Sequence, residues 1–183
     1  NVVLSGGYGL NCVANYEYLK HLEDTPVNLY VEPISSDAGT CIGAALLCYY
    51  INQDLIQEAR KKDVRGIYLG PQYDYSKDLV ERNKEIGEYE TQDATYSDIV
   101  NLIKDNNIVT IFQGRSEAGP RALGNRSILY NPADPDGKDH VNKVKRREYF
   151  RPFAGTILEE DVHDWFDLRG MESSPYMMYA VNC

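Results

Sequence analysis

Residues 2–10 read VVLSGGYGL, a short apolar run that leads directly into a glycine-rich turn. The run at 2–4 predicts a buried strand, and the helical spacing of apolar residues behind the turn predicts a helix over 10–22. The same order then returns, because 28–31 predicts a second strand and a loop of small residues leads into an apolar helix over 41–60. A strand, a turn and a helix used twice are typical of an α/β layer arrangement.

The second part of the chain has a different character, and we expect a mixed α/β (α+β) chain overall. Gly66, Gly70, Pro71 and Gly87 interrupt the stretch 66–96, and charged residues are frequent in it. This composition predicts a linker at 71–97 between a first domain at 1–70 and a second at 98–183. A β-branched run at 108–112 suits a central strand of the second domain. The other expected elements are helices over 77–86 and 98–106, capped by Ser76 and Ser97, strands over 127–130 and 153–158, and a short helix over 159–167.

Composition places the chain among globular proteins. Of its 183 residues, 43% are hydrophobic, and no apolar run approaches the ~20 residues of a membrane span. Because the start lacks the basic residues of a secretory signal, we expect a cytoplasmic protein without a membrane partner. Cys12, Cys41, Cys48 and Cys183 show no CxxC spacing, which favours buried reduced thiols. Both ends fall inside apolar runs, so we also expect a fragment.

Charge is spread unevenly along the chain. The net charge is −9, yet residues 111–155 carry nine Lys or Arg against five Asp or Glu, whereas the remainder carries 10 against 23. An acidic exterior disfavours nonspecific binding to long nucleic acids, whose affinity comes mainly from many phosphate contacts. A basic island in such a chain favours a small anionic ligand.

Two loops that precede helices could hold a nucleotide. In the turn at 5–11, adjacent glycines allow close approach of a ligand and the helix start attracts phosphate, although a tight strand-to-helix turn explains these glycines equally well. In the loop at 32–39, Asp37 could bind a metal ion, but an aspartate in this position more commonly caps a helix. The small residues from Gly39 onward would let either a ligand or a neighbouring helix pack closely.

Two basic segments could bind the anion. Residues 114–127 read GRSEAGPRALGNRS. Its three arginines, Arg115, Arg121 and Arg126, are separated by glycines, which favours convergence on a phosphate through paired guanidinium donors. At least one of the three could instead pair with an acidic loop. The run NKVKRREYFR at 142–151 supplies a second cationic edge, with about half of its side chains pointing at any one site.

Taken in order, these motifs resemble the carbamoyltransferases that act on nodulation factors and on antibiotics. The resemblance is carried by LSGG at 4–7 with Asn11, EP at 32–33, DAG at 37–39, LGP at 69–71, GRSEAGPRALGNRS at 114–127, NKVKRRE at 142–148, FRPFA at 150–154 and SPYM at 174–177. It implies the end of an actin-like ATPase domain, similar to enzymes that transfer threonylcarbamoyl groups to tRNA, followed by a YrdC-like α/β domain. It also implies conversion of carbamoyl phosphate and ATP into carbamoyl adenylate, and carbamoyl transfer to a sugar or antibiotic-like hydroxyl.

The resemblance assigns roles to individual residues. It implies that Asp37 binds a metal, with Mg²⁺ accompanying ATP and a further divalent ion, such as Fe²⁺, in the full-length enzyme. The family's HxxxH metal pair is absent, so Asp37 alone should not hold a metal tightly and this chain should not complete the transfer. The implied nucleotide contacts are Gly6, Gly7, Asn11 and Gly39; the implied catalytic residues are Arg121, Lys145 and Arg151, which also contact carbamoyl phosphate, with Arg115 and Arg126 as neighbours.

Two rival interpretations stay open on the sequence. One is a threonylcarbamoyl-AMP synthase or tRNA-modifying relative, which shares both folds, although the fused order and the loop at 114–127 favour the antibiotic and nodulation type. The other is a noncatalytic nucleotide-binding module. The expected partners are carbamoyl phosphate, ATP and a small-molecule hydroxyl acceptor, without nucleic acid, and homo-oligomerisation is left open.

Overall fold

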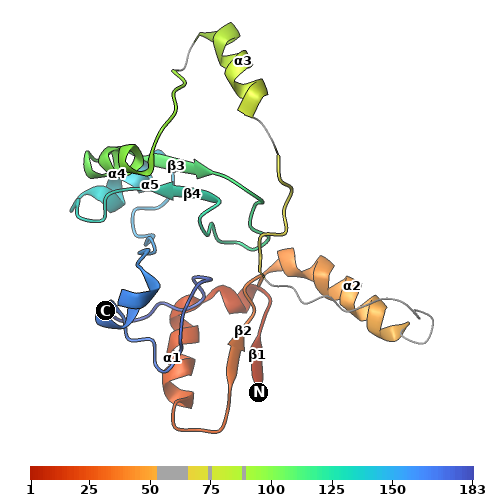
Figure 1. The fold of residues 1–183 in the computed structure, drawn as a ribbon. Helices are drawn as coiled ribbons and strands as arrows, with labels where there is room; N and C mark the ends of the chain where they lie inside the picture. Colours follow the sequence, from red (N-terminus) through yellow and green to blue (C-terminus); the bar gives the residue numbers. More distant parts are fainter. Residues whose placement is uncertain (53–65, 74–75, 88–89) are drawn as a thin grey trace. The chain divides into compact units, whose positions relative to one another are not determined.

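The computed structural model describes residues 1–52, 66–73, 76–87 and 90–183 (Figure 1). The chain forms two compact units, each assembled from stretches that are separated in sequence. The first unit comprises Asn1–Leu69, Glu117–Leu123 and Thr156–Cys183, and the second comprises Gly70–Ser116 and Gly124–Gly155. Within the described ranges both units contain helices and one small sheet, which confirms a mixed α/β chain. The expected ranges 1–70, 71–97 and 98–183 are continuous and so differ from these units.

A parallel pair of strands begins the first unit. β1 (Val2–Leu4) pairs with β2 (Leu29–Val31), and both strands lie close to where the sequence predicts them. The expected burial of the strand at 2–4 is wrong, because Val2 and Val3 are exposed and β2 is the neighbour with which β1 pairs. Parallel neighbours need a crossover connection. The chain supplies it with a 3₁₀ turn at Gly7–Leu10 and helix α1 (Cys12–Leu22), in place of the single longer helix expected.

The C-terminal segment completes the core of the first unit. Tyr16 of α1 is 2% exposed, and its hydroxyl donates to the carbonyl oxygen of Asp167 at 2.7 Å. The backbone N–H of Ala180 donates to the carbonyl oxygen of Cys12 at 3.0 Å, and Asp167 forms an isolated antiparallel β-bridge with Asn182. The buried apolar side chains of this unit include Tyr16, Val31, Ile34, Ile67, Leu168 and Met178.

Helix α2 (Thr40–Ile51) is apolar and yet exposed. Its sequence, TCIGAALLCYYI, contains no charged residue, and none of its side chains is buried. It confirms 41–51 of the helix expected over 41–60, with Asn52 as its C-cap, and 53–60 lie outside the described residues. An apolar helix normally gains stability by burying at least one face, so α2 carries an uncovered hydrophobic surface.

The four cysteines are free thiols, but they are not buried. Cys12 is half-buried, whereas Cys41, Cys48 and Cys183 are exposed. The expectation of buried thiols is therefore wrong. Its physical reason is that two of these cysteines lie on the exposed helix α2.

The second unit builds an antiparallel hairpin with helices beside it (Figure 1). β3 (Val109–Phe112) pairs with β4 (Arg126–Leu129), close to the predicted ranges, and Phe112 lies opposite Arg126. The unit's helices are α3 (Ser76–Ile86), which falls within the predicted linker, α4 (Tyr96–Lys104), which contacts β3, and α5 (Gly137–Val144).

Helix α4 begins with a capping box at Thr95, two residues before the expected cap. The Thr95 hydroxyl accepts from the Asp98 N–H at 3.3 Å, and the Asp98 carboxylate accepts from the Thr95 N–H at 2.8 Å. Ser97, the predicted cap, lies inside the helix instead. The reciprocal arrangement satisfies two backbone donors at the helix start. Ser97 lies two residues after Thr95, inside the helix, and takes no part in this capping box.

The strand predicted over 153–158 is not formed. The ring of Phe153 is 43% exposed and lies 4.2 Å from the guanidinium carbon of Arg147, rather than beside another strand. The following helix is shorter than the predicted 159–167, with a 3₁₀ turn at Glu159–Asp161 and α6 at Val162–Trp165. Among the helices of the described residues, none combines the length and the apolar character that crossing a membrane requires.

Candidate functional site

The glycine turn of the first unit presents an accessible backbone edge. Gly6 has φ +67°, a conformation that glycine adopts without steric cost. Gly6 and Gly7 are exposed, and no atom lies within 4 Å of where a Cβ on either residue would sit. Gly9 is buried, and a Cβ there would lie 2.5 Å from the hydroxyl oxygen of Ser35. The turn therefore packs through Gly9 and leaves Gly6 and Gly7 open to a ligand.

Two asparagines fix the turn to helix α1. Asn11, a predicted nucleotide contact, uses its side-chain oxygen to cap the helix by accepting from the Ala14 N–H at 3.1 Å. Asn15 is fully buried, and its amide nitrogen donates to the carbonyl oxygens of Gly9 and Met178, each at 2.8 Å. The sequence interpretation missed Asn15. Its signal was an asparagine in a helix interior, which is disfavoured unless the amide has partners.

Asp37, the predicted metal ligand, is exposed at the start of a 3₁₀ turn. Ser36, with φ +93°, caps this turn, because its hydroxyl accepts from the Ala38 N–H at 3.3 Å. The capping role that the sequence allowed for Asp37 is thus taken by its neighbour. Gly39, a predicted nucleotide contact, packs so closely on the carbonyl of Ile34 that a side chain would clash.

A metal ion at Asp37 would need ligands from outside its own loop. Across the stretches that the structure describes, no three His, Cys, Asp or Glu side chains gather in a way that could hold an ion. An exposed carboxylate does fit Mg²⁺, which commonly takes one or two protein carboxylates together with nucleotide phosphates. Asp37 therefore suits an ion that arrives with a nucleotide better than a permanent metal site.

Arg121 belongs to the first unit and contacts the glycine turn. One guanidinium nitrogen donates to the carbonyl oxygen of Leu10 at 3.3 Å, whereas its Nε is buried and makes no hydrogen bond to the described residues. Its loop is held by a hydrogen bond from the Ala118 N–H to Ile67 at 2.8 Å. The Glu117 carboxylate also accepts from the Leu123 N–H at 2.7 Å.

Arg115 and Arg126 belong to the second unit, at the base of the hairpin. The Arg126 guanidinium donates to the carbonyl oxygens of Gln113 at 2.6 Å, Asn125 at 2.8 Å and Gly114 at 3.3 Å. The guanidinium carbon of Arg126 also lies 3.7 Å from the centre of the Phe112 ring. These contacts to backbone carbonyls give Arg126 a structural role, whereas the sequence suggested pairing with an acidic loop for at least one of the three arginines. The side chain of Arg115 is exposed.

The basic run folds into a tight loop at the end of α5, which we call the basic loop (residues 145–152). Asn142 is 1% exposed, and its amide nitrogen donates to the carbonyl oxygens of Tyr149 at 3.2 Å and Arg151 at 3.1 Å. Its side-chain oxygen accepts from the Nε of Arg147, and Arg147 also donates to the carbonyl of Pro152 at 3.2 Å. One buried asparagine thus closes the loop.

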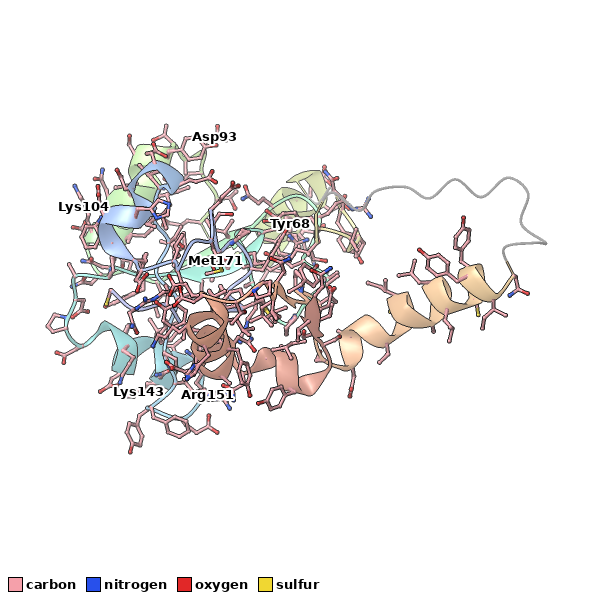
Figure 2. The ribbon with its side chains drawn as sticks, turned by 90° about the horizontal axis from the view of Figure 1, so that it is seen from below. Tyr68, Asp93, Lys104, Lys143, Arg151 and Met171 are labelled. Atoms are coloured by element: carbon pink, nitrogen blue, oxygen red, sulfur yellow. The ribbon has the colours of Figure 1, made fainter. Side chains whose placement is uncertain are left out.

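The remaining cations of this loop face solvent. Lys145 and Arg151 are exposed, and Figure 2 labels Arg151 together with Lys143 from the last turn of α5. Arg151 pairs with Glu148 at 2.6 Å, with both side chains about half exposed at 53%. The pKa of Glu148 is lowered, first by its own backbone N–H and then by Arg151. A surface pair of this kind is weak, so Arg151 can exchange Glu148 for a ligand anion.

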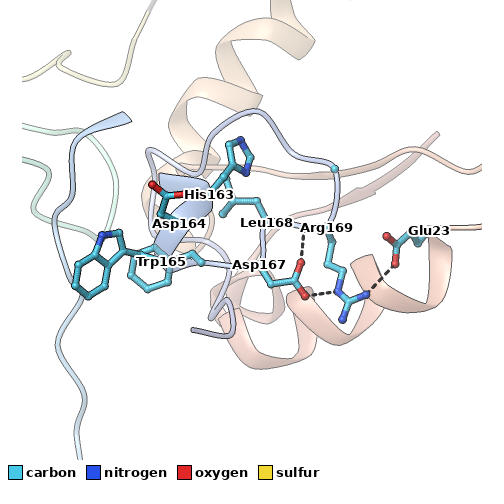
Figure 3. Close-up of a pocket in the computed structure, with 9 residues that line it drawn as sticks. Glu23, His163, Asp164, Trp165, Asp167, Leu168 and Arg169 are labelled. Atoms are coloured by element: carbon cyan, nitrogen blue, oxygen red, sulfur yellow. Dashed lines mark hydrogen bonds and ion pairs between the residues drawn. The ribbon is translucent and has the colours of Figure 1, made fainter. Parts of the chain in front are cut away.

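A solvent-open cavity of about 520 Å³ lies in the first unit, and none of the predicted site residues lines it (Figure 3). Trp165 lies at one side, and Arg169 forms ion pairs with Asp167 at 2.7 Å and Glu23 at 3.3 Å. The pKa of Arg169 is raised, first by a hydrogen bond with Tyr16 and then by Asp167. Because its cation is already paired with two carboxylates, this cavity offers little attraction to an anionic substrate.

Comparison with known proteins gives matches along most of the chain. Residues 1–46 match the family model described as carbamoyltransferase N-terminus, and residues 100–183 match the one described as carbamoyltransferase C-terminus. These matched ranges lie within the domains expected at 1–70 and 98–183.

Individual relatives agree with the family models. The chain is 37% identical over 185 residues to nodulation protein NolNO of Sinorhizobium fredii, a match that covers 97% of this chain and 26% of the relative. It is 36% identical over 184 residues to nodulation protein NolO of Bradyrhizobium diazoefficiens, covering 97% and 32%. An uncharacterized protein of Synechocystis is 37% identical over 190 residues, covering 100% and 30%. The chain therefore spans about 30% of the length of these relatives.

Proposed function

This chain belongs to the carbamoyltransferase family, and on that premise we propose that its full-length protein transfers a carbamoyl group from carbamoyl phosphate to a hydroxyl of a small molecule. The proposal includes ATP as the activating substrate and a sugar or antibiotic-like acceptor. It also includes an actin-like ATPase domain that ends in the first part of this chain and a YrdC-like domain in the second.

The observation that carries this proposal is the basic loop. Lys145 and Arg151 face solvent from a loop that a buried asparagine closes, in a chain that is acidic elsewhere. A guanidinium offers paired donors that match phosphate oxygens, and an ammonium adds a point charge. The pair is suited to a small phosphorylated substrate, and carbamoyl phosphate is the one that the family implies.

The glycine turn is the proposed nucleotide contact. The exposed backbone of Gly6 and Gly7 allows phosphate groups to approach closely, and the capped start of α1 lies next to it. Asp37 would hold the Mg²⁺ that accompanies ATP, and the ion would neutralise phosphate charge when bound. Arg121 donates to the carbonyl oxygen of Leu10 in the same turn. We propose that it also contacts the phosphate of carbamoyl phosphate.

The proposed chemistry has three balanced steps. Water attacks carbamoyl phosphate, which yields phosphate and carbamate. A carbamate oxygen then attacks the α-phosphorus of ATP and expels pyrophosphate, which gives carbamoyl adenylate. Finally the acceptor hydroxyl attacks the carbamoyl carbon, loses its proton and expels AMP. Lys145 and Arg151 stabilise the negative charge that builds up on phosphate oxygens in the first step, because preorganised cations act strongly where charge develops.

The test is an incubation of the full-length protein with ATP, Mg²⁺, carbamoyl phosphate and a panel of sugar nucleotides. We expect phosphate release from carbamoyl phosphate, pyrophosphate release that depends on it, and an acceptor that gains a carbamoyl mass. Pyrophosphate release that instead depends on L-threonine and bicarbonate would identify the threonylcarbamoyl-AMP rival. Release of neither product would indicate a noncatalytic binding module.

A further inference from the structure

Each of the two proposed ligand loops is fastened by one buried asparagine, and both asparagines use the same bonding pattern. Asn15 lies in α1 beside the glycine turn, and Asn142 lies in α5 beside the basic loop. In each case one side-chain amide donates to two backbone carbonyl oxygens. An asparagine NH₂ group has two hydrogens, so one group can satisfy two carbonyls at once.

The bonds of Asn142 fix both ends of the cationic stretch. Its amide reaches Tyr149 and Arg151, and its backbone carbonyl accepts from the Arg147 N–H at 3.1 Å. Arg146 has φ +51°, a left-handed conformation that is unfavourable for a residue with a side chain. The loop therefore keeps a strained shape because Asn142 holds it, and this shape sets where Lys145 and Arg151 project.

The bonds of Asn15 fix the inner side of the glycine turn. Its amide ties the Gly9 carbonyl to the carbonyl of Met178, a residue of the C-terminal segment that is 2% exposed. Gly9 is also packed on Ser35, which is fully buried. Gly6 and Gly7 have open space around them, so their backbone position depends on the anchoring of Gly9.

We infer that Asn15 and Asn142 are positioning residues, each of which sets the affinity of one ligand: Asn15 that of the nucleotide and Asn142 that of the phosphorylated carbamoyl donor. Neither touches a ligand itself. The inference rests on the proposed function and adds to it. It predicts that the affinity for each ligand depends on a different neutral, buried side chain.

The experiment substitutes each asparagine with aspartate in the full-length protein. Aspartate keeps the shape but loses both N–H donors. At position 142 the new carboxylate would face the Arg147 guanidinium, which favours folding. At position 15 it would replace a buried side-chain oxygen that accepts no hydrogen bond from the described residues. Asn15→Ser, which is neutral, is therefore made alongside. Binding of inorganic phosphate and of α,β-methylene-ATP with Mg²⁺ is measured by calorimetry on variants that keep the wild-type circular dichroism spectrum.

We expect a crossed result. Asn142→Asp weakens phosphate binding by about tenfold and leaves the nucleotide affinity unchanged, whereas Asn15→Asp or Asn15→Ser does the reverse. Each variant is thus the control for the other. Equal loss of both affinities in either variant, or no loss in a folded variant, overturns the inference while leaving the proposed function intact. Failure of the wild-type protein to bind either ligand overturns the proposed function, and the inference falls with it.

Discussion

At the scale of single residues, the three arginines of the loop at 114–127 look alike in sequence and act differently in the structure. Arg126 holds three backbone carbonyls of its own hairpin, Arg121 reaches the carbonyl of Leu10, and Arg115 is exposed. A guanidinium fork binds carbonyl dipoles as readily as it binds phosphate oxygens. The sequence could therefore indicate that the arginines had oxygen partners, but not which kind.

Arg126→Lys should destabilise the second unit. A lysine ammonium cannot reach three carbonyls in a fixed plane and stack on Phe112 at the same time. We expect a loss of about 2 kcal/mol in the free energy of unfolding, measured by urea titration. Arg146→Lys, at an exposed position, is the control and should change little. An Arg126→Lys protein as stable as the wild type would refute the structural role.

Gly39 and Gly43 make a matched pair that separates packing from helix propensity. A Cβ on Gly39 would clash with the backbone of Ile34, whereas a Cβ on Gly43, inside α2, would meet no atom within 4 Å. Gly39→Ala should therefore destabilise the chain by about 1–3 kcal/mol, and Gly43→Ala should stabilise it by up to about 1 kcal/mol. Thermal unfolding of this chain checks both signs. Stabilisation by Gly39→Ala would show that the loop is not closely packed there.

At the scale of elements, the sequence predicted most helices and strands to within a few residues. Local periodicity defines β1, α1, β2 and β3, because their apolar faces repeat at strand or helix spacing. The strand predicted over 153–158 is not formed, because a strand also needs a second strand to pair with. Local residues do not show which strand that would be. The capping residue of α4 was misplaced by two positions, which is the usual uncertainty of a helix end.

The capping box of α4 should make this helix sensitive to acid. The pKa of Asp98 is lowered, first by the Thr95 backbone N–H and then by the Thr95 hydroxyl. A lowered pKa means that the stabilisation is fully present above the unfolded value, near 3.8, and is lost as the pH falls through the folded value. Asp98→Asn should remove this dependence from acid unfolding curves.

Thr95→Ala tests the other half of the same box. Loss of the hydroxyl acceptor should cost about 1 kcal/mol at neutral pH, measured by chemical denaturation. Ser97→Ala is the control, because Ser97 lies inside the helix rather than at its cap. A larger effect at Ser97 than at Thr95 would contradict the observed helix start.

At the scale of the whole chain, neither compact unit is continuous in sequence, and this could not be predicted. The first unit depends on contacts such as Tyr16 to Asp167, which are 151 residues apart, and Arg121 to Leu10, which are 111 apart. Sequence patterns report local preference and burial, but they do not report which distant segments meet. The expected convergence of all the cations in one pocket stays a prediction, because Arg121 belongs to one unit and Lys145 and Arg151 to the other.

The exposed apolar surface of α2 should make this chain self-associate when it is produced alone. Leu47 is 61% exposed and Ile51 is 71% exposed, on a helix without charged residues. Apolar patches of this kind promote association. We expect concentration-dependent oligomers by light scattering, and mostly monomer after Leu47→Lys and Ile51→Lys are combined. Monomeric wild-type chain at high concentration would show that the helix is covered.

Lys145 is the proposed contact of the carbamoyl donor on which the proposed function depends most. The decisive measurement is release of phosphate from carbamoyl phosphate by full-length wild-type protein, Lys145→Ala and Lys138→Ala. Lys138 is an exposed lysine near the start of α5, the helix that precedes the basic loop. We expect Lys145→Ala to raise the KM for carbamoyl phosphate by about tenfold or more, while Lys138→Ala matches the wild type. Equal KM values for all three proteins would contradict the proposed role of Lys145.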